Sequence, residues 1–211
     1  MQPEVVIFDL ADVVCRFRPR RRLELLAEAC GVGVERVEQV LYESGRIARW
    51  DQGLGSVPEI RRTLREELGY PGGTDALHEI WCSAFEPDPR VLEVVDGLRP
   101  LRTALLTNND ALVLEALPEA LPQVAARFDP LVFSCLLGAT KPDPAAYTRA
   151  LDLVGVPPEA AVFIDDKPAN VAGAQAVGIT AIHFTGAPEL AALLADLLGR
   201  RPGDGGGVTT R

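Results

Sequence analysis

Side chains that could act on a phosphoryl group or hold a metal ion occur at or just past the ends of four short apolar runs. They are Asp9, Thr107, Lys141 and the adjacent pair Asp165 and Asp166. A carboxylate can attack phosphorus, and a hydroxyl and an ammonium group can hold phosphoryl oxygens and offset developing charge. Two neighbouring carboxylates at a buried strand end repel each other unless a cation lies with them, and oxygen ligands suit Mg²⁺. The combination is more specific than any of its members.

Each of these residues also has a plainer interpretation. Asp9 is compatible with a turn or a helix cap, and Thr107 with a polar loop that leads into a helix N-cap. Asp166 is compatible with a helix N-cap, with Asp165 exposed beside it. Lysine is scarce, however, because Lys141 and Lys167 are the only two among 21 basic residues. That scarcity favours a functional role for Lys141 over a solvated surface position.

The elements that must position these side chains follow from the apolar pattern. Short continuous apolar runs alternate with stretches of helical spacing, a pattern typical of βαβ units and a parallel sheet. In such open sheets, ligands bind at the carboxyl ends of the strands. The expected strands are Val5–Phe8, Thr103–Thr107, Leu131–Ser134, Ala161–Ile164 and Thr180–Phe184, and the expected helices include Pro144–Val154 and Ala169–Val177.

The first two strands are too far apart for one crossover, so the intervening segment predicts an inserted helical cap over residues 17–87. Amphipathic stretches within it are Leu23–Cys30, Val34–Leu41, Pro58–Leu68 and Ala76–Phe85. The core is then expected over about residues 1–16 and 88–200. The glycine-rich tail 201–211 is expected to be disordered.

The succession FDLADVV, LLTNN, TKPDPAAY and VFIDDKPANVAGAQAVGI resembles the four motifs of the haloacid dehalogenase-like hydrolase superfamily. The resemblance covers the core along most of the chain, and the helical insertion lies where a C1-type cap would sit. Within this superfamily, the sequence is similar to small sugar phosphatases and to the N-terminal phosphatase domains of epoxide hydrolases. The resemblance implies an α/β fold with a Rossmann-like parallel sheet, Asp9 as the nucleophile, and Thr107 and Lys141 as phosphoryl ligands. Asn108 and Asn170 would assist.

The same resemblance implies a bound Mg²⁺. Its ligands would be Asp9, the backbone carbonyl of Ala11 and the acidic pair. Asp166 is expected to bind directly, and Asp165 directly or through water. The expected activity is therefore Mg²⁺-dependent hydrolysis of a small-molecule phosphate monoester through an aspartyl-phosphate intermediate.

Ala11 departs from the family pattern, because phosphatases of this family usually carry a second aspartate there that protonates the leaving oxygen. Loss of a positioned proton donor costs about 10²–10⁴-fold in rate. Water, the substrate or another side chain such as Asp12 could supply the proton. Alternatively, the chain is a catalytically impaired relative that binds a phosphorylated ligand or a protein partner.

Two other activities fit less well. A hydrolase that cleaves a C–P bond would need a cap lysine, and the segment 17–87 has none. A haloacid dehalogenase would not carry the metal-binding pair Asp165 and Asp166.

Three residues in or near the cap are candidates for contact with the substrate. Arg16 and Arg18 belong to a basic run where the chain leaves the core, and their guanidinium groups suit an anionic substrate. A solvated first turn of a cap helix is the alternative. Trp50 lies in a cap turn that could select the substrate, although a core anchor is the commoner role of tryptophan.

Composition restricts the remaining possibilities. A net charge of −9 argues against nucleic-acid binding, which needs a basic surface. No apolar run reaches the roughly 18 residues of a membrane span, and no signal peptide is recognised. Four dispersed cysteines without a C-x-x-C pair favour a reduced, cytoplasmic setting. The expected partner is a small phosphorylated metabolite, bound by a monomer or a homodimer.

Overall fold

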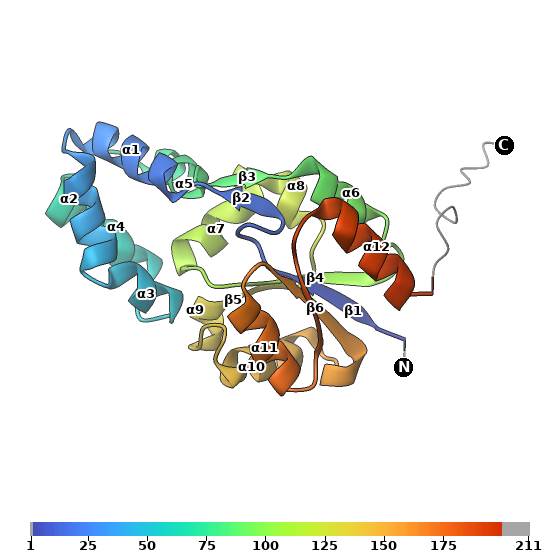
Figure 1. Cartoon of the computed structure of the whole chain (residues 1–211). Coiled ribbons are helices and arrows are strands. Elements are labelled where there is room, and N and C mark those ends of the chain that lie inside the picture. Colours follow the sequence, from blue (N-terminus) through green and yellow to red (C-terminus); the bar gives the residue numbers. More distant parts are fainter. Residues whose placement is uncertain (1, 200–211) are drawn as a thin grey trace.

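The structure, a computed structural model, describes residues 2–199. Five parallel strands form its central sheet in the order β5-β4-β1-β6-β7 (Figure 1). The strands are β1 (Val5–Phe8), β4 (Arg102–Thr107), β5 (Leu131–Phe133), β6 (Ala161–Asp165) and β7 (Thr180–His183). This arrangement confirms the predicted α/β class and the parallel core. The tail 201–211, expected to be disordered, lies outside the described residues.

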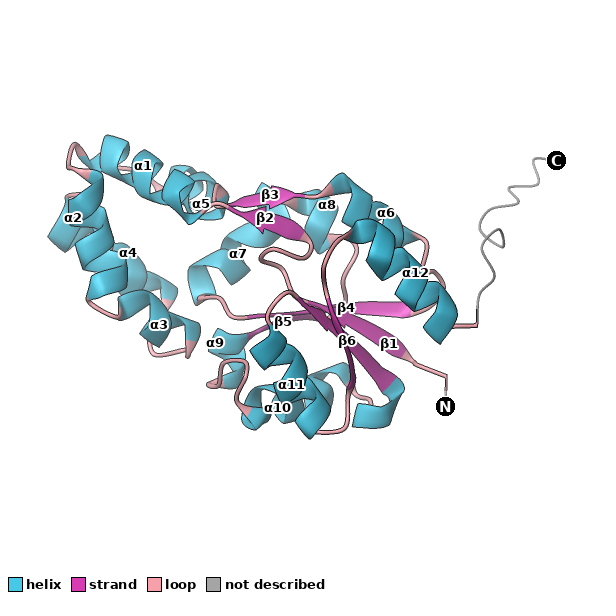
Figure 2. Ribbon diagram, in the orientation of Figure 1, coloured by secondary structure: helices cyan, strands magenta, loops and turns pink. Residues whose placement is uncertain are grey.

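Helices cover both faces of the sheet, as Figures 1 and 2 show. Successive side chains of a strand point to opposite faces. In β1, Val6 and Phe8 accordingly belong to one hydrophobic cluster and Val5 and Ile7 to the other. One layer contains α6 (Pro89–Asp96), α7 (Ala111–Ala120), α8 (Pro122–Ala125) and α12 (Ala187–Leu197), and the other contains α9 (Ser134–Leu137), α10 (Pro144–Val154), η2 (Pro158–Ala160) and α11 (Pro168–Ala176). Burial on both faces explains why β1 is a continuous apolar run.

The helices between residues 19 and 82 form the part of the molecule that stands over the carboxyl ends of the strands (Figure 1). We call residues 19–82 the cap. Its elements are α1 (Pro19–Cys30), α2 (Val34–Glu38), the π-helix η1 (Gln39–Glu43), α3 (Arg46–Asp51), α4 (Val57–Leu68) and α5 (Thr74–Cys82). Ser56 and Glu59 form a capping box at the start of α4, which satisfies backbone donors there.

Two short antiparallel strands connect the cap to the core, and the sequence did not predict them. They are β2 (Cys15–Phe17) and β3 (Phe85–Pro87), with Arg16 opposite Glu86. Each has three residues and is only partly buried, so neither shows the continuous apolar run that identifies the core strands. Their pairing places the start and the end of the cap side by side.

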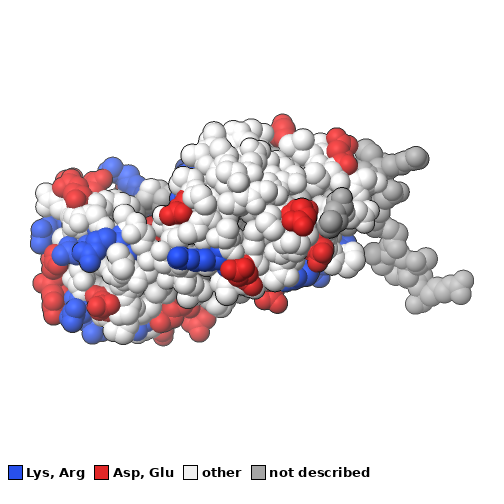
Figure 3. Space-filling model, turned by 90° about the horizontal axis from the view of Figure 1, so that it is seen from below, with Lys and Arg blue, Asp and Glu red and all other residues white. Residues whose placement is uncertain are grey.

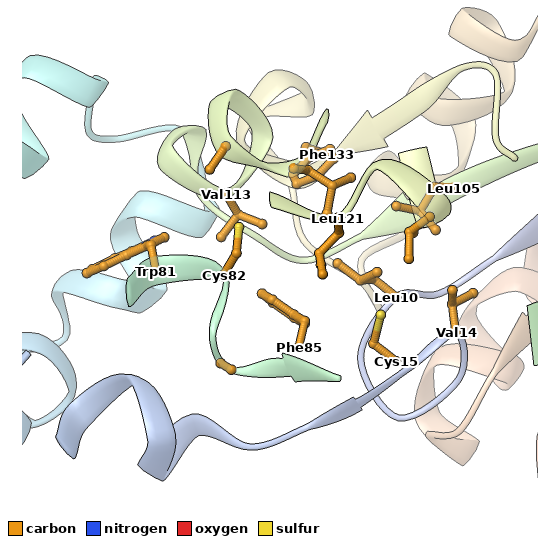
Figure 4. Packing of buried hydrophobic residues seen from close by; sticks show 14 of the residues in the cluster. Leu10, Val14, Cys15, Trp81, Cys82, Phe85, Leu105, Val113, Leu121 and Phe133 are labelled. Atoms are coloured by element: carbon orange, nitrogen blue, oxygen red, sulfur yellow. The ribbon is translucent and has the colours of Figure 1, made fainter. Parts of the chain in front are cut away.

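The cap packs on the core mainly through α5 and α7. Figure 4 shows Cys82 of α5 pointing toward Val113 of α7, with Phe85, Leu10 and Cys15 gathered nearby. All five side chains belong to the same hydrophobic cluster. The cap and the first core layer therefore share one buried interior.

The described surface mixes charges of both signs. Figure 3 shows basic and acidic side chains interspersed over the cap. No helix between residues 2 and 199 combines the length and the apolar character that a bilayer crossing requires.

Candidate active site

Asp9, Lys141 and Asp165 meet at the carboxyl edge of the sheet. Asp9 directly follows β1, Asp165 ends β6, and Lys141 lies in the loop between α9 and α10. The Lys141 Nζ atom is 2.8 Å from Asp9 Oδ1 and 2.8 Å from Asp165 Oδ2. It also donates to the carbonyl of Leu106 at 2.8 Å. Because an ammonium group has three donors, Lys141 is fully hydrogen-bonded in this buried position.

Asn108 holds the backbone of Lys141 rather than its side chain. The Asn108 Nδ2 atom donates to the Lys141 carbonyl at 2.9 Å, and the Lys141 N–H donates to Asn108 Oδ1 at 2.9 Å. Both polar atoms of the Asn108 side-chain amide are therefore bonded to the backbone of Lys141. Asn108 was predicted to assist in binding the substrate's phosphoryl group, and this geometry shows how it positions Lys141.

Asp165 is fixed by a set of donors from α11 and its first turn. Asn170 Nδ2 donates to both carboxylate oxygens at 2.9 and 3.0 Å, and the Lys167 N–H donates to Oδ1 at 2.9 Å. Tyr147 donates from its hydroxyl to the Asn170 carbonyl at 2.7 Å. Asp165 is therefore held in place as the partner of Lys141, supported by Asn170.

Asp166 has a different environment from its neighbour. Its Oδ1 atom is buried and has no hydrogen-bond partner among the described residues. One ligand oxygen each from Asp9, Asp165 and Asp166 lies within 4.8 Å of the other two. A buried acceptor without a partner is costly unless a ligand satisfies it.

The charges of the site also favour a bound cation. Burial raises the pKa of Asp9 and the nearby Asp165 raises it further, while Lys141 lowers it. Burial likewise raises the pKa of Asp166, and Lys167 opposes that effect while Asp165 and Asp12 add to it. Hard oxygen donors of this kind suit Mg²⁺. The residues present therefore fit the metal that the sequence implied.

Ala11 lies in the loop that follows β1, and its backbone carbonyl is close in sequence to Asp9. The Asp12 N–H donates to the Cys15 carbonyl at 2.6 Å, and the Cys15 N–H donates to the Leu10 carbonyl at 2.8 Å. Neither bond uses the Ala11 carbonyl. Asp12 has a φ of 59°, and its Oδ1 atom accepts the Phe17 N–H at 2.9 Å. The carboxylate of Asp12 thus ties this loop to β2, and it is near enough to Asp166 to affect its pKa.

Thr107 ends β4, the strand next to β1, and is 1% exposed. Its Oγ1 atom accepts a hydrogen bond from Asn109 Nδ2 at 2.7 Å. The Asn109 N–H in turn donates to Ser134 Oγ at 3.0 Å. The sequence assigned no role to the side chains of Asn109 and Ser134, because polar residues after a strand resemble ordinary loop residues.

The three cap candidates lie in different surroundings. Arg16 lies on β2 and Arg18 just after it, both exposed, and Arg18 Nε is 3.6 Å from Glu86 Oε2. No contact joins either arginine to Asp9 or Lys141 within the described chain. The Trp50 side chain is 5% exposed, and its ring centroid is 6.3 Å from that of Trp81. The structure thus places Trp50 in the position of a core anchor.

Polar contacts also join the cap to α7. Trp81 Nε1 donates to the carboxylate oxygens of Asp110 at 3.1 and 3.0 Å. Asp110 also caps α7 by accepting the N–H groups of Leu112 and Val113. Burial and the neighbouring Asp110 raise the pKa of Asp51 to about 8, while Arg22 lowers it. The cap–core junction therefore contains an acidic group on each side, Asp51 half-buried and Asp110 buried.

Comparison with characterised proteins agrees with this arrangement. The sequence model of haloacid dehalogenase-like hydrolases matches residues 3–178. Phosphatase MT3486 of Mycobacterium tuberculosis is 29% identical over 86% of this chain and 87% of its own length. Acyl-CoA dehydrogenase family member 10 of Mus musculus is 39% identical over 50% of this chain, a match that spans 10% of that longer protein.

Solved structures show the same fold. A HAD-like family hydrolase from Porphyromonas gingivalis has a TM-score of 0.73 and 26% identity, over 92% of this chain and 98% of that one. A HAD family enzyme from Bacteroides thetaiotaomicron, in complex with magnesium and inorganic phosphate, has a TM-score of 0.70 and 21% identity, over 86% and 93% of the two chains. Together with the family match over most of its length, these findings establish that the chain belongs to the haloacid dehalogenase-like hydrolases.

Proposed function

We propose that this hydrolase is a Mg²⁺-dependent phosphatase that cleaves a small phosphate monoester through an aspartyl-phosphate on Asp9. The observation that carries the proposal is the 2.8 Å contact between Asp9 Oδ1 and Lys141 Nζ, beside the unpartnered buried oxygen of Asp166. The phosphatase among the relatives supports the reaction class. The magnesium and phosphate bound to a structural neighbour support the metal.

Four residues of the chain would each have a role in the reaction. One oxygen of the Asp9 carboxylate attacks phosphorus, and the bond from phosphorus to the leaving oxygen breaks. Lys141 offsets the charge on the phosphoryl oxygens, and Asp165 holds Lys141 in position. Thr107 donates its hydroxyl hydrogen to a phosphoryl oxygen. Water then attacks the phosphorus of the aspartyl-phosphate, which frees Asp9 and releases inorganic phosphate.

The metal would be held by Asp9, Asp166 and the carbonyl of Ala11, with Asp165 binding directly or through water. When bound, Mg²⁺ supplies positive charge that stabilises the transferring phosphoryl group. Asp165 already makes hydrogen bonds to Lys141 and Asn170. Its contact with the metal is therefore the one that we expect to be indirect.

The leaving oxygen needs a proton, and Ala11 cannot provide it. We infer that the proton comes from solvent or from the substrate, with Asp12 as the alternative donor. A phosphate ester whose leaving group departs without a proton avoids this step. The enzyme is therefore expected to act on an aryl phosphate faster than on an alkyl phosphate of similar size.

The expected substrate is a small phosphorylated metabolite, and Arg16 and Arg18 are candidates to attract its charge. A monomer or a homodimer would suffice, because every proposed catalytic group comes from one chain. The cysteines at the four positions 15, 30, 82 and 135 are free in the structure. A reduced compartment such as the cytoplasm is part of this proposal.

The test is phosphate release from an activated aryl phosphate in the presence of MgCl₂. Asp9→Asn should abolish turnover, because an amide cannot act as the nucleophile. Asp152→Asn is the matched control, since Asp152 is exposed on α10, and it should retain full activity. Absence of turnover in the wild type, with phosphate still raising its melting temperature, would favour the alternative of a silent phosphate-binding relative.

A further inference from the structure

Three hydrogen bonds connect the end of α3 in the cap to Thr107 in the core. Ser134 donates from Oγ to the carbonyl of Asp51 at 2.6 Å. The same Oγ accepts the N–H of Asn109 at 3.0 Å, and Asn109 Nδ2 donates to Thr107 Oγ1 at 2.7 Å. Ser134 and Thr107 are 0% and 1% exposed, and the two bonds made by Asn109 are buried while the bond to Asp51 is partly buried.

The direction of the last bond determines what Thr107 can still do. A hydroxyl has one donor hydrogen and two acceptor sites. Because the amide of Asn109 donates to Thr107, the Thr107 hydrogen stays free to point elsewhere. A phosphoryl oxygen carries lone pairs and no hydrogen, so it needs that free donor.

Ser134 donates its single hydroxyl hydrogen to a carbonyl of the cap, that of Asp51. Its contact with the Asp51 carbonyl is 2.6 Å long, whereas its distance to the Asn109 carbonyl is 3.4 Å. The shorter distance identifies the cap carbonyl as the main acceptor. Ser134 is thereby left as an acceptor toward the Asn109 backbone.

The cap turn fits closely against the same part of the core. Gly53 has a φ of 78°, and a Cβ atom there would lie 2.3 Å from the Cys135 carbonyl oxygen. A side chain at position 53 would therefore push the turn away from α9. Glycine allows the Asp51 carbonyl to stay within hydrogen-bonding distance of Ser134.

We propose that Asn109 and Ser134 are positioning residues that aim the Thr107 hydroxyl at the phosphoryl group and make this aim depend on the docked cap turn. The inference rests on the proposed function, in which Thr107 binds the phosphoryl group. It adds that affinity for phosphate is set partly by a cap segment that does not touch phosphate.

The test measures the Kd of inorganic phosphate by calorimetry with MgCl₂ present, and the KM and kcat for an aryl phosphate. Ser134→Ala and Asn109→Ala should each weaken phosphate binding about tenfold, the value of one hydrogen bond to a charged ligand. KM should rise by the same factor, and kcat should change less. Ser83→Ala is the matched control, because Ser83 Oγ donates at 2.6 Å to the carbonyl of Ile80 at the end of α5. It should leave the phosphate Kd unchanged.

A double-mutant cycle separates positioning from general destabilisation. In a Thr107→Val background, Ser134→Ala and Asn109→Ala should cause no further loss of phosphate affinity, because the group that they orient is gone. Gly53→Ala should weaken phosphate binding in the wild type but not in the Ser134→Ala variant. Should Gly53→Ala fail to fold, the comparison of phosphate affinity between Ser134→Ala and Ser83→Ala still tests the inference.

Two results would overturn the inference while leaving the proposed function intact. One is a wild type that binds and releases phosphate while Ser134→Ala and Asn109→Ala behave like Ser83→Ala. The other is a loss that adds fully to that of Thr107→Val. A wild type that neither binds phosphate nor hydrolyses the ester would instead reject the proposed function itself.

Discussion

The ammonium group of Lys141 lies 2.8 Å from the carboxylate of Asp9, and both side chains are shielded from solvent. The same ammonium group contacts Asp165 at 2.8 Å. One buried cation thus serves two buried anions. A buried charge that loses its partner is strongly unfavourable. The contacts that hold the site in its geometry therefore also stabilise the fold.

Replacement of Lys141 by methionine should both destabilise the protein and abolish phosphate release. The expected loss in unfolding free energy is about 3–5 kcal/mol, because Asp9 and Asp165 keep their burial and lose their shared partner. Urea unfolding measures the change. Lys167→Met is the control, since Lys167 is exposed, and a similar loss in that variant would contradict the explanation.

Magnesium should raise the melting temperature of the wild type, and Asp166→Asn should remove most of that increase. A ligand that binds only the folded state stabilises it, and the unpartnered oxygen of Asp166 is the position that the metal would satisfy. Burial raises the pKa values of Asp9 and Asp166, so protons compete with the metal. The Mg²⁺ affinity should therefore increase from about pH 5 to about pH 7. An increase in melting temperature that is equal in Asp166→Asn would argue against this metal site.

Asp51 should make the fold less stable as the pH rises. Its pKa is raised from 3.8 to about 8, so the folded state keeps the proton that the unfolded state has already lost. The stabilisation is fully present below the unfolded pKa and is lost as the pH rises through the folded pKa. The limiting slope is about −1.4 kcal/mol of unfolding free energy per pH unit. Melting temperatures of Asp51→Asn should fall less than those of the wild type between about pH 5 and about pH 8, and parallel curves would refute the assignment.

Trp50 should matter for stability more than for substrate affinity. Trp50→Ala should lower the unfolding free energy by about 3–5 kcal/mol, as removal of a large buried ring does. Trp50→Phe should keep KM for an aryl phosphate close to that of the wild type, because its ring is 5% exposed and packs beside Trp81. A large rise in KM for Trp50→Phe at unchanged stability would instead support the predicted role in substrate selection.

The core could be predicted because its sequence signals are local. The strand Val5–Phe8 and the helix Pro144–Val154 have in the structure the same bounds as in the sequence prediction. The predicted candidates Asp9 and Asp165 meet because parallel strands carry their carboxyl ends to one edge, and Lys141 reaches that edge from the loop between α9 and α10. Their catalytic roles stay predictions, as do the division into core and cap domains and the roles of Arg16 and Arg18.

The features that the sequence did not predict depend on contacts between residues that are remote in sequence. The strands β2 and β3 stabilise each other across the whole cap, and neither has an apolar run of its own. Ser134 and Asp51 are 83 residues apart, so no spacing rule could have paired them. Likewise, nothing in the sequence distinguishes Asn108, which clamps a backbone, from Asn109, which orients a hydroxyl.

The pairing of β2 with β3 would allow the cap to be exchanged as a module. Because the chain leaves the core and returns to it at neighbouring points, an insert of another length or shape can be joined there without altering the distance that it must span. A transplanted cap would have to supply two things at its new boundary, a carbonyl for Ser134 and an indole for Asp110. Selectivity for the leaving group could then be engineered by grafting, while the sheet edge and its chemistry remain those of the recipient.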